Sequence, residues 1–594
     1  MPLINPHQPS STFINFNFKM SNINGKWLQQ NTYDAIVIGS GISGGFAAKE
    51  LSEKGLKTLV LERGRNVKHI QDYPTMSANP WDLPFGDRVP KEELDKHYAK
   101  QSRTGYTIRQ STKHWFVKDD EHPYTEVSRF DWMRGYHVGG RSLLWGRQSY
   151  RWNEMDFEAN GKEGIGADWP IRYADIAPWY DYVESWIGVS GSKEGLPQLP
   201  DGKFQPAMEL NCVEQMVKQN MEAKIAGRKL FIGRVAHLTE PNEVQKALGR
   251  GSCQYRNLCI RGCPYGAYYS SPAGALVAAE KTGNMTLRPN SIVVSLIYAD
   301  KKGKATGVKI LDAETKKEEE FYAKIIFINA SALASALILL NSTSDRFPNG
   351  MGNGSDQVGR NVMDHHFLVG ASGEAEGFND KYYKGRRPNG VYIPRFRNND
   401  AKTKQKDFLR GYGYQGGASR SGWQRLVAEL GFGKDMKDEL QNPGQWTMGI
   451  NAFGEMLPNP NNRIIRNTEV KDMYGLPTMT MDVKYGENEL AMRKDMKTSA
   501  VEMMEAGGLK KVEGWERPCA PGLGIHEMGT ARMGKDPKTS VLNGFNQMHE
   551  VKNVFITDGA CMASSSCVNP SLTYMALTAR AVDYVVKEMG KQNL

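Results

Sequence analysis

A strand–helix–strand pattern is visible near the start of the chain in the alternation of apolar and polar blocks. Residues 33–38 form a continuous apolar, β-branched run, which is typical of a parallel strand buried on both faces. Apolar positions then recur at helical spacing, and Gly55 stands where a glycine commonly follows the end of a helix. Residues 56–61 form a second apolar run. The pattern predicts a parallel β–α–β unit.

Three glycines of this unit lie where the first strand turns into the helix. Gly39, Gly41 and Gly44 give G-x-G-x-x-G, which permits a tight turn, close approach of a pyrophosphate and close packing of helix on strand. Glu62 ends the second strand 18 residues after Gly44, where an acidic side chain meets a ribose hydroxyl in dinucleotide sites. This order predicts a dinucleotide site without distinguishing NAD from FAD. An ordinary tight turn in a β–α–β unit is the alternative.

Later in the chain, similar patterns predict more of this sheet and a separate domain. Residues 286–312 alternate as in a β-meander or a β-hairpin, and residues 324–341 read as a strand, a turn of small residues and an apolar helix. The second segment adds another piece to the nucleotide-binding sheet. Residues 373–511 differ in composition and carry short strand patterns such as 446–457, which indicates an inserted domain.

An aromatic-rich segment lies between these regions. Residues 173–187 predict a helix that buries Trp179, Tyr182 and Trp186. Packing in a core is favoured for these rings over stacking on a ligand.

Length and charge narrow the class of protein. A chain of 594 residues can bury more than one core, which predicts two domains. The formal net charge of +10 is thinly spread, which favours a solvated surface over docking to nucleic acid or an acidic protein. The most apolar stretch, residues 325–340, is too short and too polar to span a bilayer. Residues 1–32 predict a flexible arm without a secretory signal, and Met20 is an alternative start.

The cysteines suggest a metal centre. Seven cysteines in so long a chain argue against a disulfide framework. Cys253, Cys259 and Cys263 form C-x5-C-x3-C followed by proline, and such a group can converge on a soft metal, with an iron–sulfur cluster favoured. Zinc needs a fourth ligand, which His237 could supply only through folding. Unligated buried thiols are the third possibility.

Candidate catalytic groups lie near the C-terminus. His526 sits in a glycine-flanked loop, and its imidazole can accept a hydroxyl proton as a general base, although a structural histidine is the alternative. Residues 554–573 predict a strand, a loop and a helix, with Asn569 as N-cap and Pro570 at the first helical position. The free N–H groups and positive dipole end of such a helix suit an anionic ligand such as a reduced cofactor.

Together, these motifs resemble the glucose–methanol–choline (GMC) oxidoreductase family. They are G-x-G-x-x-G at 39–44, RGYHVGG at 134–140, VGRNVMDHH at 358–366, HEMGTARMG at 526–534 and NPSLT at 569–573. Within the family, the cysteine loop and the run ADWPIRYADIAPWYDYVE at 167–184 resemble the catalytic subunits of bacterial FAD-dependent sugar dehydrogenases. These include the glucose, gluconate, sorbitol and glucoside 3-dehydrogenase types.

The resemblance implies an α/β fold with a Rossmann-like FAD-binding domain, discontinuous in sequence, and an inserted α+β substrate domain. The FAD-binding domain would comprise residues 33–150, 252–368 and 505–594, with the iron–sulfur loop inside the second segment. The substrate domain would comprise residues 151–251 and 369–504.

Roles for single residues also follow from the resemblance. His526 would be the catalytic base, and Asn569 would hold the substrate oxygen. Leu144 stands where some relatives carry a histidine that binds FAD covalently, so non-covalent FAD is expected. The implied FAD-binding positions are Gly39, Gly41, Gly44, Glu62, Gly139, Gly140, Ser142, Asp558 and Pro570.

The implied reaction is oxidation of a sugar hydroxyl by hydride transfer to flavin, with His526 taking the hydroxyl proton. In sugar dehydrogenases with such a loop, three cysteines hold a 3Fe-4S cluster, which implies Cys253, Cys259 and Cys263 as ligands. Electrons would then leave to an outside acceptor. A GMC oxidase that reduces oxygen without a cluster is the alternative, and a basic nucleic-acid-binding protein with a zinc knuckle is a third class.

Partners and location are further expectations from the resemblance. The implied partners are a small chaperone-like subunit and a haem-bearing cytochrome c as electron acceptor. We expect the chain to reach the periplasm already folded, attached to a partner with a twin-arginine signal; the cytoplasm is the alternative.

Overall fold

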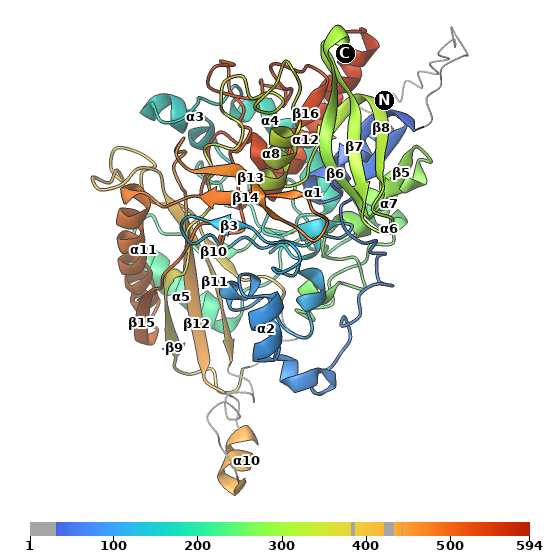
Figure 1. The fold of residues 1–594 in the computed structure, drawn as a ribbon. Coiled ribbons are helices and arrows are strands. Elements are labelled where there is room, and N and C mark those ends of the chain that lie inside the picture. Colours follow the sequence, from blue (N-terminus) through green and yellow to red (C-terminus); the bar gives the residue numbers. More distant parts are fainter. Residues whose placement is uncertain (1–30, 382–386, 421–432, 442–443) are drawn as a thin grey trace, which may run out of the picture.

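The computed structural model describes residues 31–381, 387–420, 433–441 and 444–594 (Figure 1). The expected flexible arm and the alternative start at Met20 fall almost entirely outside these residues, and Thr32 already begins the first strand. In the described part of the chain, no helix is long and apolar enough to cross a membrane.

The largest sheet joins both ends of the chain. Its strands run in the order β5-β2-β1-β8-β7-β6, and β16 also pairs with β8. The strands β5, β2, β1, β8 and β16 are parallel, whereas β6 and β7 form the antiparallel hairpin that the sequence predicts. The bounds are β1 (Thr32–Ile38), β2 (Thr58–Leu61), β5 (Met285–Arg288), β6 (Ser291–Ala299), β7 (Lys304–Asp312), β8 (Glu318–Ile328) and β16 (Val554–Ile556).

The second half of strand β1, Ala35–Ile38, is buried on both faces of this sheet, which explains why these four residues are all apolar. Ala35 and Val37 belong to one apolar cluster, and Ile36 and Ile38 belong to another. Helix α1 (Ile42–Glu53) packs against α7 (Ala275–Lys281) and α12 (Ser571–Gly590). Helix α8 (Ala332–Asn341) follows β8 and contacts β6. The predicted nucleotide-binding sheet is therefore present.

A six-stranded sheet lies at the lower left of Figure 1, backed by the long helix α11 (Glu487–Ala506). Its order is β15-β9-β12-β11-β10-β4, and a third sheet has the order β13-β14-β3. The bounds are β3 (Thr125–Glu126), β4 (Phe231–Ile232), β9 (Val369–Ala375), β10 (Val391–Ile393), β11 (Tyr412–Arg420), β12 (Trp446–Gly454), β13 (Arg463–Lys471), β14 (Pro477–Asp482) and β15 (Lys510–Glu516). The remaining α-helices are α2 (Lys91–His97), α3 (Glu154–Glu163), α4 (Tyr173–Ile187), α5 (Cys212–Lys224), α6 (Glu243–Ala247) and α10 (Gly433–Gln441).

Helix α4 forms where the sequence predicts it, but its buried face is different. Tyr180 is fully buried, whereas Trp179, Tyr182 and Trp186 are only partly buried. The reason is that α4 packs against α12 and these rings border the flank of α1, where Phe46 meets Trp186 with ring centroids 5.5 Å apart.

Candidate active site

A cavity of about 550 Å³ opens where the parallel strands of the largest sheet end. Ile38 at the end of β1, Leu61 at the end of β2, Asn329 after β8 and Asp558 after β16 all line it. Ligands of open α/β sheets bind outside the carboxyl ends of the strands, and this volume falls within the usual range for ligand pockets. Of the predicted site residues, Gly39, Gly41, Glu62, Gly140, Ser142, His526, Asp558 and Asn569 line this cavity.

The glycine loop between β1 and α1 makes a tight turn that leaves one side open to the cavity. Gly39 has a φ of +92°, and a Cβ on Gly44 would lie 1.9 Å from the Gly39 carbonyl oxygen. A Cβ on Gly41, by contrast, would meet no described atom within 4 Å. Gly44 therefore serves packing of α1 beneath the loop, and Gly41 leaves the cavity side open for close approach of a ligand.

Glu62 is tied to the glycine loop through Ser40. The Ser40 hydroxyl donates to Glu62 Oε2 at 2.6 Å, and the Gly64 N–H donates to Oε1 at 3.0 Å. Burial raises the pKa of Glu62, although these hydrogen bonds act in the opposite direction. A carboxylate has about four lone-pair directions, so Glu62 keeps capacity to accept from a ribose hydroxyl. Sequence reasoning missed Ser40.

The second glycine pair adjoins the same loop. Gly139 donates its N–H to the Ser40 hydroxyl at 3.0 Å, and a Cβ on Gly139 would lie 2.6 Å from Pro272. Gly140 follows with a φ of +46° and lines the cavity, whereas Gly139 is not among the lining residues. The Ser142 hydroxyl accepts from the Ser271 N–H at 3.0 Å. Gly140 thus forms part of the cavity wall, and Gly139 connects that wall to the Ser40 hydroxyl.

Asp558 lies under the cavity at the end of β16. Its carboxylate accepts from the Ser335 hydroxyl at 2.6 Å and from the Ala560 N–H at 2.9 Å. Burial raises the pKa of Asp558 to about 6. Its position agrees with a contact to the phosphate or ribityl part of a dinucleotide.

The predicted start of the last helix is wrong by one residue. Helix α12 begins at Ser571 with Pro570 as its N-cap, so Asn569 does not cap the helix and Pro570 is not a helical position. The physical reason is that the Asn569 side chain turns into the cavity instead of back onto the helix. Pro570 itself is not among the lining residues. The opening turn of α12 still borders the cavity through Ser571 and Tyr574.

His526 and Asn569 are brought together although 43 positions separate them. The Asn569 amide nitrogen lies 3.3 Å from His526 Nε2, and the Asn569 amide oxygen accepts from Gln415 at 2.6 Å. Burial holds the pKa of His526 well below its usual value, and the positive charge of Arg141 acts in the same direction. The imidazole is therefore neutral near pH 7 and can accept a proton. Sequence reasoning missed Gln415, on β11 of the six-stranded sheet.

The His526 loop is fixed by two buried carboxylates that sequence reasoning did not assign. Asp364 accepts from three backbone N–H groups, those of Gly522, Gly524 and His526, at 2.8–2.9 Å. Burial, reinforced by the nearby Glu527, raises the pKa of Asp364 to about 7.

Glu527, next to His526, forms a two-point ion pair with Arg141 at 2.6 and 3.0 Å. The only signals in the sequence were the positions of Asp364 inside VGRNVMDHH and of Glu527 inside HEMGTARMG.

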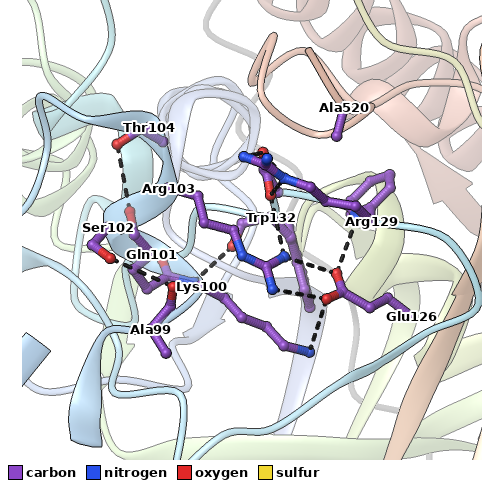
Figure 2. A network of polar contacts seen from close by, with 12 residues as sticks. Ala99, Lys100, Gln101, Ser102, Arg103, Thr104, Glu126, Arg129, Trp132 and Ala520 are labelled. Carbon is purple, nitrogen blue, oxygen red and sulfur yellow. Dashed lines mark hydrogen bonds and ion pairs between the residues drawn. The ribbon is translucent and has the colours of Figure 1, made fainter. Parts of the chain in front are cut away.

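An ion-pair network, shown in Figure 2, lies beside the segments that form one wall of the cavity. Arg103 makes a two-point contact with Glu126 at 2.9 and 3.0 Å and reaches the buried Asp131 at 3.3 Å. The neighbouring residues 106–107 and 132–136 line the cavity. Planar guanidinium–carboxylate pairs fix geometry as well as charge, so the network locks these two segments together.

A second cluster joins the third sheet to the cavity beside Glu62. Arg63 pairs with Asp472 at 2.7 Å, approaches His122 at 3.3 Å and stacks on Tyr136 with its guanidinium carbon 4.4 Å from the ring centre. Asp472 follows β13 directly, and all four residues line the cavity. Nothing in the sequence pattern indicated this contact, because its members come from distant segments.

The cysteine loop lies close to the cavity. Folding brings His237 to Cys259, with Nε2 and Sγ 3.5 Å apart, and Ile260 lines the cavity. Burial raises the pKa of Cys253 to about 11, and Cys259 and Cys263 act in the same direction. Within the described residues, no group of three or more His, Cys, Asp or Glu side chains is placed to hold a metal ion, so the structure does not support a cluster on these thiols.

The cavity does fit FAD. Its lining combines the open face of Gly41, the Glu62 carboxylate and the start of α12. In addition, the buried Asn329 amide nitrogen and Tyr574 hydroxyl line the cavity and have no hydrogen-bond partner among the described residues. Buried polar groups normally have hydrogen-bond partners, so these two groups are available to bind a ligand.

Two known proteins resemble this chain over nearly its whole length. The fructose dehydrogenase large subunit of Gluconobacter japonicus is 28% identical over 564 residues, which cover 94% of this chain and 98% of that protein. The 2-methyl-1,2-propanediol dehydrogenase of Mycolicibacterium austroafricanum is 26% identical over 579 residues, with 94% and 96% covered. The crystal structure of pyridoxine 4-oxidase from Mesorbium loti has the same fold, with a TM-score of 0.57, 16% identity, and coverage of 93% and 99%.

Two segments match a protein family directly. Residues 33–367 match the N-terminal part of the GMC oxidoreductases, and residues 458–578 match the C-terminal part. The stretch between them, which holds strands β9 to β12, matches neither part. Together with the cavity at the strand ends, these matches identify the chain as a member of the GMC oxidoreductase family.

Proposed function

We propose that the protein oxidises a CH–OH group of a sugar or sugar-derived alcohol, with FAD bound non-covalently in the cavity. The observation that carries the proposal is the pairing of His526 with Asn569 in a cavity bordered by the glycine loop. A proton acceptor and an amide thus lie within hydrogen-bond reach of one substrate oxygen. The similarity to a fructose dehydrogenase subunit supports the sugar class.

His526 and Asn569 have different roles at the substrate hydroxyl. Bound FAD would supply the acceptor for the hydride from the carbinol carbon. His526 takes the hydroxyl proton at Nε2, so the O–H bond breaks as an N–H bond forms. The Asn569 amide donates to the same oxygen and orients it. Arg141 and Glu527 border the site and hold the loop that carries His526.

The lining also supports a polyhydroxylated substrate. Gln415 presents an amide to the cavity, and Phe367 and Phe453 stack with ring centroids 5.3 Å apart and also line it. A sugar carries hydroxyl groups for an amide and C–H faces for aromatic rings, so this combination suits it.

The proposal is tested by anaerobic titration of the FAD-loaded protein with aldoses, ketoses, polyols, gluconate and simple alcohols. We expect a sugar or sugar-derived alcohol to bleach the flavin absorbance, with product analysis giving the oxidised carbon. Oxygen uptake in the same samples separates a dehydrogenase from the alternative oxidase. Failure of every alcohol to bleach the flavin would refute the proposal.

The route by which electrons leave the flavin is a separate proposal. The spacing of Cys253, Cys259 and Cys263 and the resemblance to sugar dehydrogenases support a 3Fe-4S cluster on these thiols. The described residues contain no group of three such side chains placed to hold a metal ion, so the cluster rests on the spacing and the resemblance.

We expect anaerobically purified protein to contain iron and acid-labile sulfide in the ratio of the cluster and to give its paramagnetic resonance signal. Both should be lost in Cys253→Ser, whereas Cys519→Ser, outside the loop, should retain them. Iron-free protein with full electron transfer to an acceptor would remove the cluster from the proposal.

The pH profile gives another expected result. Because burial lowers the pKa of His526, and His365 and Arg141 beside it act in the same direction, the base stays unprotonated well below pH 6.5. The competent, unprotonated form of His526 therefore persists as the pH falls, and protonation of this base should cause no acid limb in the rate constant of flavin reduction between pH 8 and pH 6. Because the pKa of Asp364 is about 7, stopped-flow measurement with saturating substrate compares the unaltered protein with Asp364→Asn. An acid limb centred on pH 6.5 that persists in Asp364→Asn would contradict the prediction.

A small chaperone-like subunit, a cytochrome c acceptor and a periplasmic location remain proposals that rest on the resemblance alone. Co-purification from the native cell and fractionation of its compartments test them directly.

A further inference from the structure

A second histidine stands behind His526. His365 Nδ1 lies 2.9 Å from His526 Nδ1, and His365 Nε2 lies 3.1 Å from the carbonyl oxygen of Ser565. The two rings meet at 74° with centroids 4.8 Å apart, and His365 is 1% exposed. The ring thus bridges His526 to the backbone ahead of α12.

The backbone around both histidines fixes their relative position. Met363 and Met528 exchange two backbone hydrogen bonds at 2.9 and 3.0 Å. Met363 lies two residues before His365, and Met528 lies two residues after His526. Asp364 accepts from the N–H of His526 at 2.9 Å. The contact between the rings is therefore built into the pairing of the two chain segments.

The Ser565 carbonyl determines which nitrogens carry protons. A carbonyl oxygen only accepts, so His365 must carry its proton on Nε2. Burial lowers the pKa of His365 to about 4, and the ring is neutral near pH 7. A neutral ring with a proton on Nε2 has a lone pair on Nδ1. His365 Nδ1 therefore accepts, and His526 must donate from its own Nδ1.

The cavity side of His526 agrees with this assignment. A neutral His526 with its proton on Nδ1 has a lone pair on Nε2, and the Asn569 amide nitrogen lies 3.3 Å from Nε2 as a donor. The Asn569 amide oxygen accepts from the Gln415 amide at 2.6 Å. The Ser565 carbonyl at one end therefore determines the tautomer of His526, and Asn569 at the other end is compatible with it.

We propose that His365 is a positioning residue that fixes His526 as the Nδ1–H tautomer, with the basic Nε2 directed at the substrate. The inference rests on the proposed role of His526 as base, but it concerns a residue that touches neither substrate nor cofactor. The hydrogen bond at one ring nitrogen sets the state of the other, and the wrong tautomer would present an N–H where a lone pair is needed.

His365 also confines the abstracted proton. When His526 gains a proton at Nε2, its Nδ1–H bond to His365 strengthens, because the donor is now charged. A proton could pass from His526 Nδ1 to His365 Nδ1, but the Ser565 carbonyl cannot take one on. The positive charge therefore stays on the two rings until the Nε2 proton leaves through the cavity.

The tautomer can be measured directly by ¹⁵N NMR on protein labelled in its histidine rings. In FAD-loaded protein without substrate, we expect His526 to be protonated on Nδ1 and His365 on Nε2, with the His526 signal identified by its loss in His526→Asn. A His526 ring found as the Nε2–H tautomer in the unaltered protein would overturn the proposal without any further variant.

Variants then link the tautomer to the rate of flavin reduction. His365→Leu removes the acceptor, so we expect the Nε2–H tautomer of His526 to become populated and the rate constant to fall about 100-fold, the lower end of the range for lost general-base catalysis. His365→Asn returns an accepting oxygen and should restore the Nδ1–H tautomer and a rate within about 10-fold of the unaltered protein.

The matched control is His366, an adjacent imidazole with 0% exposure whose ring packs against Tyr485, with centroids 5.7 Å apart, instead of against His526. His366→Leu should leave the tautomer of His526 and the rate unchanged, apart from a loss of stability. A rate loss in His365→Leu without a change of tautomer, or an equal tautomer shift in His366→Leu, would overturn the proposal. Because the NMR measurement needs no turnover, failure of the proposed oxidation would leave this test intact.

Discussion

Replacement of His526 by alanine lowers the rate constant of flavin reduction by substrate about 10²- to 10⁴-fold, the usual contribution of a positioned general base. Its side chain is directed at Asn569 and lies in the cavity lining, whereas the glycine loop and Glu62 that would hold FAD come from other segments. FAD therefore stays bound, with an unchanged dissociation constant.

Anaerobic stopped-flow spectroscopy and a flavin titration measure the two effects separately. His549→Ala is a suitable control, because this partly buried histidine contacts Ser540 and is absent from the cavity lining. Unimpaired flavin reduction in the alanine variant would end the assignment of His526 as the base.

Replacement of Gly41 by valine abolishes FAD binding but leaves the fold of the apoprotein intact. A Cβ at Gly41 meets no described atom within 4 Å, and the residue has an extended backbone with a negative φ of −66°. The added side chain stands in the space where the pyrophosphate approaches the backbone. We expect the dissociation constant of FAD to rise at least about 100-fold, which corresponds to about 2.7 kcal/mol.

The matched variant is Gly44→Ala, which probes the other side of the same loop. Its Cβ would lie 1.9 Å from the Gly39 carbonyl oxygen, so the loop and α1 must move apart. Overpacking of this kind costs about 1–3 kcal/mol and lowers the melting temperature of the apoprotein itself. Thermal unfolding and FAD titration of both variants separate the two roles. Equal melting temperatures for Gly44→Ala and the unaltered apoprotein would contradict this division.

Local patterns predicted the parts of the fold that lie within one segment. The β-branched run before Gly39, the glycine spacing and the helix up to Gly55 are all present, because each depends on residues close in sequence. The strand and helix at 324–341 and the hairpin at 286–312 are present for the same reason. The start of α12 was missed by one residue, since the Asn569 amide is used in the cavity.

Contacts between distant segments were not predictable in the same way. The pair of Arg63 with Asp472 spans 409 positions, and the pair of Arg141 with Glu527 spans 386. Nothing near Gln415 marks it as a neighbour of Asn569, because only the pairing of β11 within the six-stranded sheet brings it there. The site residues found from sequence were those in recognisable motifs, and their supporting partners required the fold.

The pairing of β16 with β8 has a consequence for the order in which the protein is synthesised and folds. Strand β16, His526, Asn569 and helix α12 are translated long after Thr32, yet they complete a sheet that begins at Thr32. Until β16 has left the ribosome, Ile326–Ile328 of β8 lack this partner strand, and the cavity lacks the wall that His526 and Asn569 form. We therefore expect a chain that stops before β16 to bind no flavin and to expose an unpaired segment of β8.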